Sequence, residues 1–178
     1  MARAKRKAAR KTGARAESAA QQDAIALLKA DHRQVEEWFG QFESTRSDAR
    51  KQSLAQKVCQ ALKVHTQIEE EIFYPAVRGL GSQKAEDIIL EALEEHHVVK
   101  LVLEELPTVD PEDEHFSAKM TVLSELVEHH ADEEEDEMFV LAAKLGDTEL
   151  EALGAQLTAR TEELTRAVEA SGSRTGRR

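Results

Sequence analysis

Apolar residues recur every three or four positions along most of the chain, which is the spacing of an amphipathic helix. The pattern predicts four long helices, over residues 20–44, 49–78, 82–106 and 110–145. A fifth helical segment is expected from residue 147, because leucines continue there at the same spacing. No alternating stretch typical of a strand interrupts these segments, so the pattern predicts an all-α fold.

Capping and turn residues separate the predicted helices. Ser47-Asp48 is expected to cap the second helix, and Gly79-Leu80-Gly81 breaks the chain after it. Asp110-Pro111 is expected to start the fourth helix, with Asp110 as its N-cap, and Gly146 to end it. Two helix pairs with short connections, each unable to bury its apolar face alone, predict an up-and-down four-helix bundle.

Composition and length fit one such domain. Hydrophobic residues make up 40% of the 178 residues and aromatic residues only 4%, which favours packing through Leu, Val and Ala. We expect the bundle to span residues 20–146, an additional C-terminal helix to span 147–170, and residues 171–178 to form a frayed tail. The leucine stripe of the additional helix is expected to pack on the bundle or against another chain, which would make an oligomer.

Charge divides the chain into a basic head and an acidic remainder. Residues 1–16 contain seven Lys and Arg and no acid. Because the whole chain carries −11, the rest carries −18. We expect a disordered tail over residues 1–19 that makes at most weak, unspecific contact with nucleic acid.

The cysteine content and the hydropathy of the chain indicate the cellular compartment in which the protein is expected. The single cysteine, Cys59, cannot form an internal disulfide, which is typical of a reducing compartment and favours a cytoplasmic protein. No apolar run approaches the roughly 18 residues that cross a membrane, so no membrane span is expected.

The chemistry of the chain concentrates in a motif that occurs twice. In the first copy, His65 and Glu69 are four residues apart, which places both on one helix face beside apolar Leu62 and Ile72. A buried carboxylate is costly unless it is paired or bound to a metal. The second copy is the run from Glu128 to Phe139, which again contains His, several Glu, an apolar residue and Phe.

Each copy has a partner histidine upstream, and the two halves align by a nearly constant offset. His32 lies 64 residues before His96, and His65 lies 65 before His130. Both His32 and His96 fall on the apolar stripes of their helices.

The offset grows to 66 between Glu69 and Glu135 and between Phe73 and Phe139. A π-bulge between His130 and Glu135 would restore their common face. The regular pairs His130/Glu134 and His129/Glu133 remain alternatives, but the register of Phe139 favours Glu135.

Four imidazoles and two carboxylates are therefore expected to converge at one level of the bundle. Such a nitrogen and oxygen site suits iron, manganese or zinc. One metal would bind His32 and His65, the other His96 and His130. The predicted bridges are Glu69 and Glu135, with Glu70 or Glu134 as further oxygens and Phe73 and Phe139 as an apolar cover.

From Ile25 to Leu145, the order of these histidines and glutamates resembles the hemerythrin-like, or HHE cation-binding, domain. The resemblance also rests on Phe73-Tyr74-Pro75 and on Glu95-His96-His97. It implies a non-haem di-iron bundle that binds O₂, NO or peroxide for sensing, scavenging or storage. It also implies that His32, His65, His96 and His130 are terminal iron ligands and that Glu69 and Glu135 are bridges.

One position departs from the oxygen carriers of this family, which have a fifth histidine where this chain has Lys100. We expect Lys100 to face Glu36, the corresponding position of the first half, and neither iron to be saturated by protein. Such a site favours peroxide, NO or redox chemistry over O₂ carriage. Two alternatives remain: a weak peroxidase or catalase-like enzyme, and a metal-free helical interaction module with a nucleic-acid-contacting tail.

Overall fold

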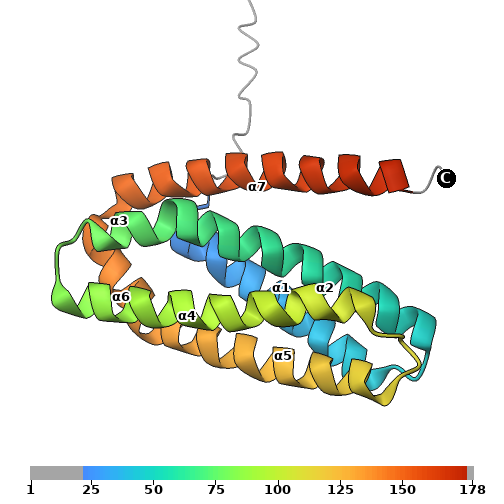
Figure 1. Cartoon of the computed structure of the whole chain (residues 1–178). Helices are drawn as coiled ribbons and strands as arrows, with labels where there is room; N and C mark the ends of the chain where they lie inside the picture. The colour runs from blue at the N-terminus through green and yellow to red at the C-terminus, as the bar shows by residue number, and fades with distance from the viewer. Residues whose placement is uncertain (1–21, 176–178) are drawn as a thin grey trace, which may run out of the picture.

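The computed structural model describes residues 22–175 and contains helices and no strand in that range, so the predicted all-α fold is confirmed (Figure 1). The described elements, in chain order, are α1 (Ala24–Ser44), α2 (Asp48–Ile68), η1 (Glu69–Phe73), α3 (Tyr74–Arg78), α4 (Gln83–Glu105), η2 (Leu106–Thr108), α5 (Glu114–Glu133), η3 (Glu134–Met138), α6 (Phe139–Ala142), η4 (Ala143–Leu145) and α7 (Asp147–Thr175). The predicted basic tail over residues 1–19 lies outside the described residues, as do positions 176–178.

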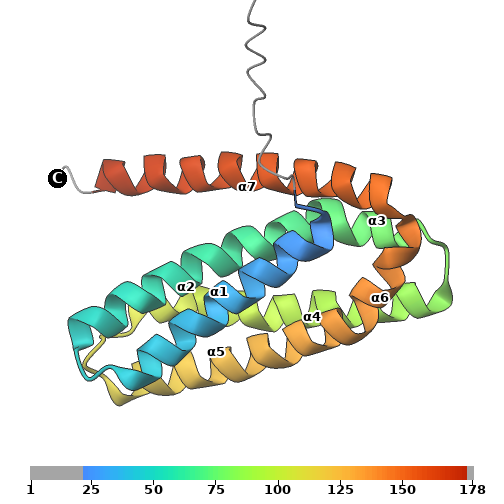
Figure 2. The same cartoon turned by 180° about the vertical axis from the view of Figure 1, so that it is seen from behind.

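Four long rods form the bundle. The first is α1, the second runs through α2, η1 and α3, the third is α4, and the fourth runs through α5, η3 and α6 (Figures 1 and 2). The segments η1 and η3 are π-helical turns inside continuous helices, whereas η2 and η4 are short 3₁₀ turns at helix ends. Successive rods run up and down, as predicted.

Capping residues explain most of the helix starts. The side chain of Ser47 accepts a hydrogen bond from the amide of Arg50, and that of Ser82 accepts one from the amide of Ala85. Both hydrogen bonds satisfy amides that have no partner within the first turn of a helix.

The predicted start of the fourth helix at Asp110 is wrong. The helix begins at Glu114, and Asp113 is its N-cap, with a side chain that accepts from the amide of His115. Asp110 instead closes a turn by accepting from the amide of Glu112. Both aspartates have capping chemistry, and the turn around Pro111 uses the first of them.

The core consists of two apolar clusters with a polar layer between them. One cluster surrounds Leu28, Ile68 and Phe73, and the other surrounds Val35 and Leu62. Because His32 lies between Leu28 and Val35 in α1, and His65 lies between Leu62 and Ile68 in the second rod, the histidines occupy the layer between the clusters.

The helix α7 packs on the bundle along α1, α2 and η1 (Figure 2). Its buried stripe is Leu150, Leu153 and Leu157, and Gly154 lies directly against the backbone of Gln22 at the start of α1. The helix continues to Thr175, beyond the predicted end at residue 170. None of the helices in residues 22–175 combines the length and apolar character needed to cross a bilayer.

Candidate metal centre

Two π-helical turns position the inward carboxylates. The amide of Tyr74 bonds to the carbonyl of Glu69, and the amide of Phe139 bonds to the carbonyl of Glu134, each five residues back. A π turn admits one extra residue and rotates everything after it. In both halves this rotation follows the glutamate, so His and Glu remain in regular i, i+4 register.

The predicted choice of Glu135 as an inward carboxylate is therefore corrected by the structure, which places Glu134 there. Glu134 is 1% exposed, whereas the side chain of Glu135 is 27% exposed and pairs with Lys29 at 2.9 Å. No residue is inserted between His130 and its glutamate. The offset from the first half stays at 65, and the residue corresponding to Phe139 is Tyr74.

The four predicted histidines converge in two pairs. The Nε2 atoms of His32 and His65 are 3.1 Å apart, and those of His96 and His130 are also 3.1 Å apart. The first pair joins α1 to α2, and the second joins α4 to α5. All four side chains are buried, so the layer between the apolar clusters contains four imidazoles whose Nε2 atoms face one another in pairs.

Glu69 lies between the two histidine pairs. Its Oε1 atom is 3.1 Å from Nε2 of His65, and its Oε2 atom is 3.4 Å from Nε2 of His96. Glu134 reaches both pairs through one oxygen, because its Oε2 atom is 3.4 Å from Nε2 of His32 and 3.8 Å from Nε2 of His130. Each carboxylate thus faces one histidine from each pair.

The donors fit metal ions. Both oxygens of Glu69 and one oxygen of Glu134 are buried and have no hydrogen-bond partner among the described residues. Two nitrogens that bind one ion at about 2.1 Å and nearly at right angles are about 3 Å apart, which matches each imidazole pair. Two fully buried groups of donors lie close enough to share an ion: His32, His65, Glu69 and Glu134 form one, and Glu69, His96 and His130 form the other.

When no metal is bound, protons on the histidines supply positive charge beside the buried carboxylates. Burial favours the neutral form of His96, but the neighbouring carboxylates of Glu69 and Glu70 outweigh burial and raise the pKa of His96 to about 9. Burial acts against the charge of Glu69 too, yet the neighbouring His65 and His96 hold the pKa of Glu69 well below its usual value. The layer therefore binds positive charge when metal is absent.

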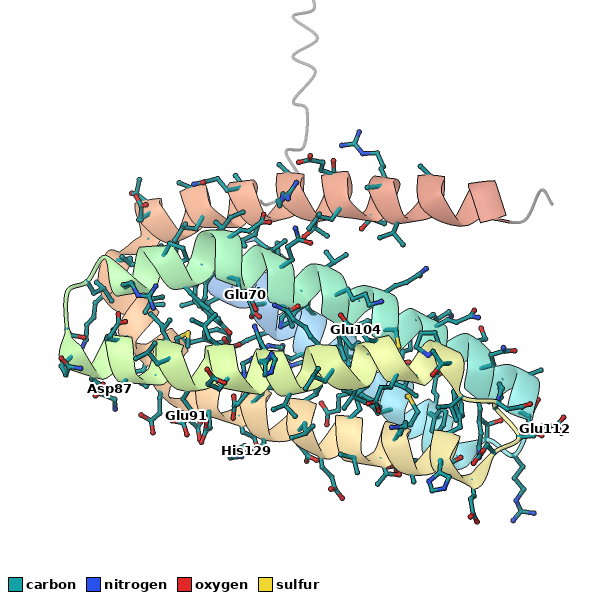
Figure 3. The ribbon with its side chains drawn as sticks, viewed as in Figure 1. Glu70, Asp87, Glu91, Glu104, Glu112 and His129 are labelled. Carbon is teal, nitrogen blue, oxygen red and sulfur yellow. The ribbon has the colours of Figure 1, made fainter. Side chains whose placement is uncertain are left out.

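A second set of carboxylates faces the outer nitrogens of the imidazoles. The Nδ1 atom of His32 is 3.2 Å from Glu135, and that of His96 is 2.9 Å from Glu70. The remaining two Nδ1 atoms, of His65 and His130, are 3.6 Å from Asp31 and 2.6 Å from Glu95, respectively. Such partners orient a metal-binding imidazole and direct its other nitrogen inward. Figure 3 shows Glu70 of η1 on the side of its helix toward α4, which contains its partner His96.

Tyr74 is a member of the site that is not among the predicted ligands. Its hydroxyl donates to Oε1 of Glu134 at 2.9 Å and lies 3.2 Å from Nε2 of His96. Its ring stacks on His96, as the ring of Phe139 stacks on His32 in the other half. Burial raises the pKa of the Tyr74 hydroxyl well above its usual value, so the group stays protonated. The correct offset of 65 would have identified it.

Other predicted residues lie near the cluster or away from it. Phe73 packs edge to face on Phe139 at 5.6 Å, and both are buried beside the cluster, as expected of an apolar cover. The alternative pair His129/Glu133 is at the surface, where His129 is 65% exposed and points outward (Figure 3).

The expected contact between Lys100 and Glu36 is not formed. Lys100 instead bonds to both oxygens of Glu70, while Glu36 lines a groove between α1 and α5.

A small apolar cavity adjoins the histidines. Its volume is about 20 Å³, and its walls include Val35, Leu62, Val99 and Val127 together with all four inward imidazoles. A cavity of this size holds about one water-sized molecule. Apolar side chains on one side and imidazole nitrogens on the other make this cavity a pocket for a very small ligand.

Comparisons with known proteins agree with this arrangement. The family described as the Hemerythrin HHE cation binding domain matches residues 23–142. A crystal structure of a protein containing this domain from Mycobacterium kansasii superimposes with a TM-score of 0.74 at 26% identity, covering 88% of this chain and 95% of that one.

A DNA nickase of a Nostoc species is 25% identical over 113 residues, which are 64% of this chain and 31% of the nickase. The chain therefore spans about a third of that relative's length. Because the family match covers most of the chain and contains all of the clustered histidines and glutamates, the chain belongs to the hemerythrin HHE cation-binding domain family.

Proposed function

We propose that this protein binds two non-haem iron ions and uses them to bind O₂, NO or peroxide for sensing, scavenging or storage. The observation that carries the proposal is the position of Glu69, whose two oxygens face different histidine pairs. A carboxylate placed in this way can bridge two ions. His32 and His65 would hold one ion, His96 and His130 the other, and Glu134 would be the second carboxylate in place of Glu135.

The donor set supports iron. Imidazole and carboxylate suit iron, manganese and zinc, and no thiolate takes part, because Cys59 lies in the apolar cluster at the far end of the bundle. A pair of irons would supply reversible binding and redox chemistry for a small oxygen or nitrogen species. The protein contributes a cavity of about 20 Å³ beside the histidines, which is large enough for a ligand about the size of one water molecule.

Metal content tests the ligand set. We expect the purified protein, loaded with iron, to hold two irons per chain by elemental analysis. Glu134→Ala should hold fewer than one, whereas Glu133→Ala, at the neighbouring surface position, should keep both. If the two variants lost iron equally, Glu134 would not be a ligand distinct from its neighbour. Fewer than one iron per chain in the native protein would instead favour the metal-free interaction module.

Absorption spectroscopy and peroxide turnover distinguish a ligand-binding protein from a peroxidase or catalase-like enzyme. Azide and peroxide should change the absorption spectrum of the iron-loaded protein, and His65→Ala should abolish the change. Steady-state consumption of peroxide by the native protein, absent in His65→Ala, would identify a peroxidase or catalase-like enzyme. A spectral response without turnover would support sensing or storage.

A further inference from the structure

A second cavity lies between α7 and the bundle and shares His65 with the metal centre. Its volume is about 290 Å³, and residues of α1, α2 and α7 line it. Figures 1 and 2 show α7 diverging from α2 toward its C-terminal end. This cavity is roughly twice the size of an apolar cavity of about 150 Å³ that accepts benzene.

The sequence of α7 explains why the space exists. The inner stripe of the helix begins with Leu150, Leu153 and Leu157, which are buried against the bundle. Over the next turns, the residues of α7 that line the cavity are Thr161, Thr165 and Val168. Threonine is smaller than leucine, so the change leaves unfilled volume between the helices.

The walls of the cavity suit an aromatic ring. Val35, Trp38 and Val64 are among its lining residues, beside the polar side chains of Gln34, Lys57 and Gln60. Trp38 is the only tryptophan of the chain. An indole and several branched aliphatic side chains are typical of a pocket for a planar apolar molecule.

Two buried polar atoms of residues that line the cavity make no direct hydrogen bond within the described part of the chain. The hydroxyl of Thr161 and the Nδ1 atom of His65 are buried and make no hydrogen bond to any residue that the structure describes. The side chain of His65 is 6% exposed, and its Nδ1 atom is 3.6 Å from Oδ2 of Asp31, which also lines the cavity. Buried polar groups without partners are rare, and each calls for a bound water or ligand.

A hydroxyl group fits between His65 and Asp31. Two atoms 3.6 Å apart can each lie within hydrogen-bond distance, about 2.8 Å, of a single oxygen. A hydroxyl can donate one hydrogen bond and accept another, so it can bridge Nδ1 of His65 and the Asp31 oxygen, whereas a hydrocarbon can do neither.

We propose that this cavity binds a small neutral aromatic alcohol of the phenol class. The ring lies against Trp38 and the valines, and the hydroxyl bridges His65 and Asp31. His65 belongs to both sites, but no metal contacts the proposed ligand, so its binding can be tested on the metal-free protein. A failure here leaves the proposed di-iron function intact, and the reverse is also true.

Trp38 reports binding directly. Titration of the metal-free protein with p-cresol, with excitation at the red edge of tryptophan absorption, should give a saturable change with a Kd of about 0.1 mM. Toluene lacks only the hydroxyl and should bind at least about tenfold more weakly, because the hydrogen bond to a charged group is lost. Equal affinity for toluene, or no saturable change with p-cresol, would overturn the proposal.

Two substitutions locate the site. Thr165→Leu fills the cavity and should weaken p-cresol binding by at least about tenfold, while Ala167→Leu on the exposed face of the same helix should leave it unchanged. Thermal unfolding followed by circular dichroism checks that both variants fold. Asp31→Ala should bring the affinities for p-cresol and toluene within about threefold of each other. Unweakened binding in Thr165→Leu, or an undiminished preference in Asp31→Ala, would contradict the assignment.

Discussion

Tyr74 makes the two halves of the site chemically different at the scale of single residues. Its hydroxyl donates to one oxygen of Glu134, whereas the corresponding residue of the other half, Phe139, has no hydroxyl to offer to Glu69. Glu69 therefore has two oxygens facing the histidines, and Glu134 has one. The two carboxylates of the centre are related by the internal repeat but differ in their hydrogen bonds.

Removal of the Tyr74 hydroxyl should destabilise the protein. Hydrogen bonds to a charged group contribute about 1.5–3 kcal/mol, and Glu134 is buried, so its oxygen would find no water. We expect Tyr74→Phe to lower the free energy of unfolding of the metal-free protein by about 2 kcal/mol, measured by urea denaturation.

Gln67→Ala provides the control for Tyr74→Phe. It removes an exposed hydrogen bond to Glu71 and should change stability by less than about 0.5 kcal/mol. Equal effects of the two substitutions would show that the Tyr74 hydroxyl has no buried role.

The sequence predicted five of the six clustered residues, because histidine and glutamate on apolar helical stripes are a strong signal. The prediction of Glu135 instead of Glu134 rests on aligning Phe73 of the first half with Phe139 of the second. In the structure the aromatic rings that stack on histidines are Tyr74 and Phe139. Neighbouring aromatic residues, Phe73-Tyr74, made the register ambiguous, and only the packing of each ring resolves it.

At the scale of elements, the π turns η1 and η3 determine which residues after each inward glutamate face the interior of the bundle. Each turn follows its inward glutamate and rotates the next residues, so that Phe73 and Tyr74 are both buried although they are adjacent in sequence. Helical periodicity carries no signal for a π turn, which is why the first of these turns was not predicted.

The close packing of α7 on α1 depends on Gly154. A Cβ atom at this position would clash with the carbonyl oxygen of Gln22 and lie 3.0 Å from the amide nitrogen of Ala24. We expect Gly154→Ala to destabilise the protein by about 1–3 kcal/mol, because backbone atoms cannot move aside as a side chain can.

Gly40→Ala is the matched control for Gly154→Ala, since Gly40 is helical and no atom lies within 4 Å of its added Cβ. Alanine there should stabilise the protein by about 0.5–1 kcal/mol through its helix propensity. Thermal unfolding of both variants measures the difference, and a stabilising Gly154→Ala would contradict the observed packing.

At the scale of the whole molecule, the protonation of the polar layer couples stability to pH. The pKa of His96 is raised to about 9, above the value of about 6.5 in an unfolded chain. A raised pKa stabilises the fold fully below pH 6.5, and this contribution is lost as pH rises through 9. Unfolding of the metal-free protein with a chelator present should therefore require about 2 kcal/mol less at pH 8.5 than at pH 6.5.

Iron binding should show the opposite dependence on pH, because a metal displaces the proton from each imidazole. The affinity for ferrous iron is expected to rise over the same interval. His115→Asn, which removes an exposed histidine far from the layer, should preserve both trends. A metal-free protein whose stability rose between pH 6.5 and 8.5 would exclude protonated imidazoles in the layer.

Two of the four outer carboxylates cross between the two halves of the chain. Glu135 of the second half holds His32 of the first, and Glu70 of the first half holds His96 of the second. A fragment that stopped in the turn after Arg78 would leave His32 without its anchor and Glu70 without its imidazole. Neither repeat is self-sufficient, so closure of the bundle and completion of the metal centre are one event, and a separated half would have to dimerise to rebuild what the intact chain makes alone.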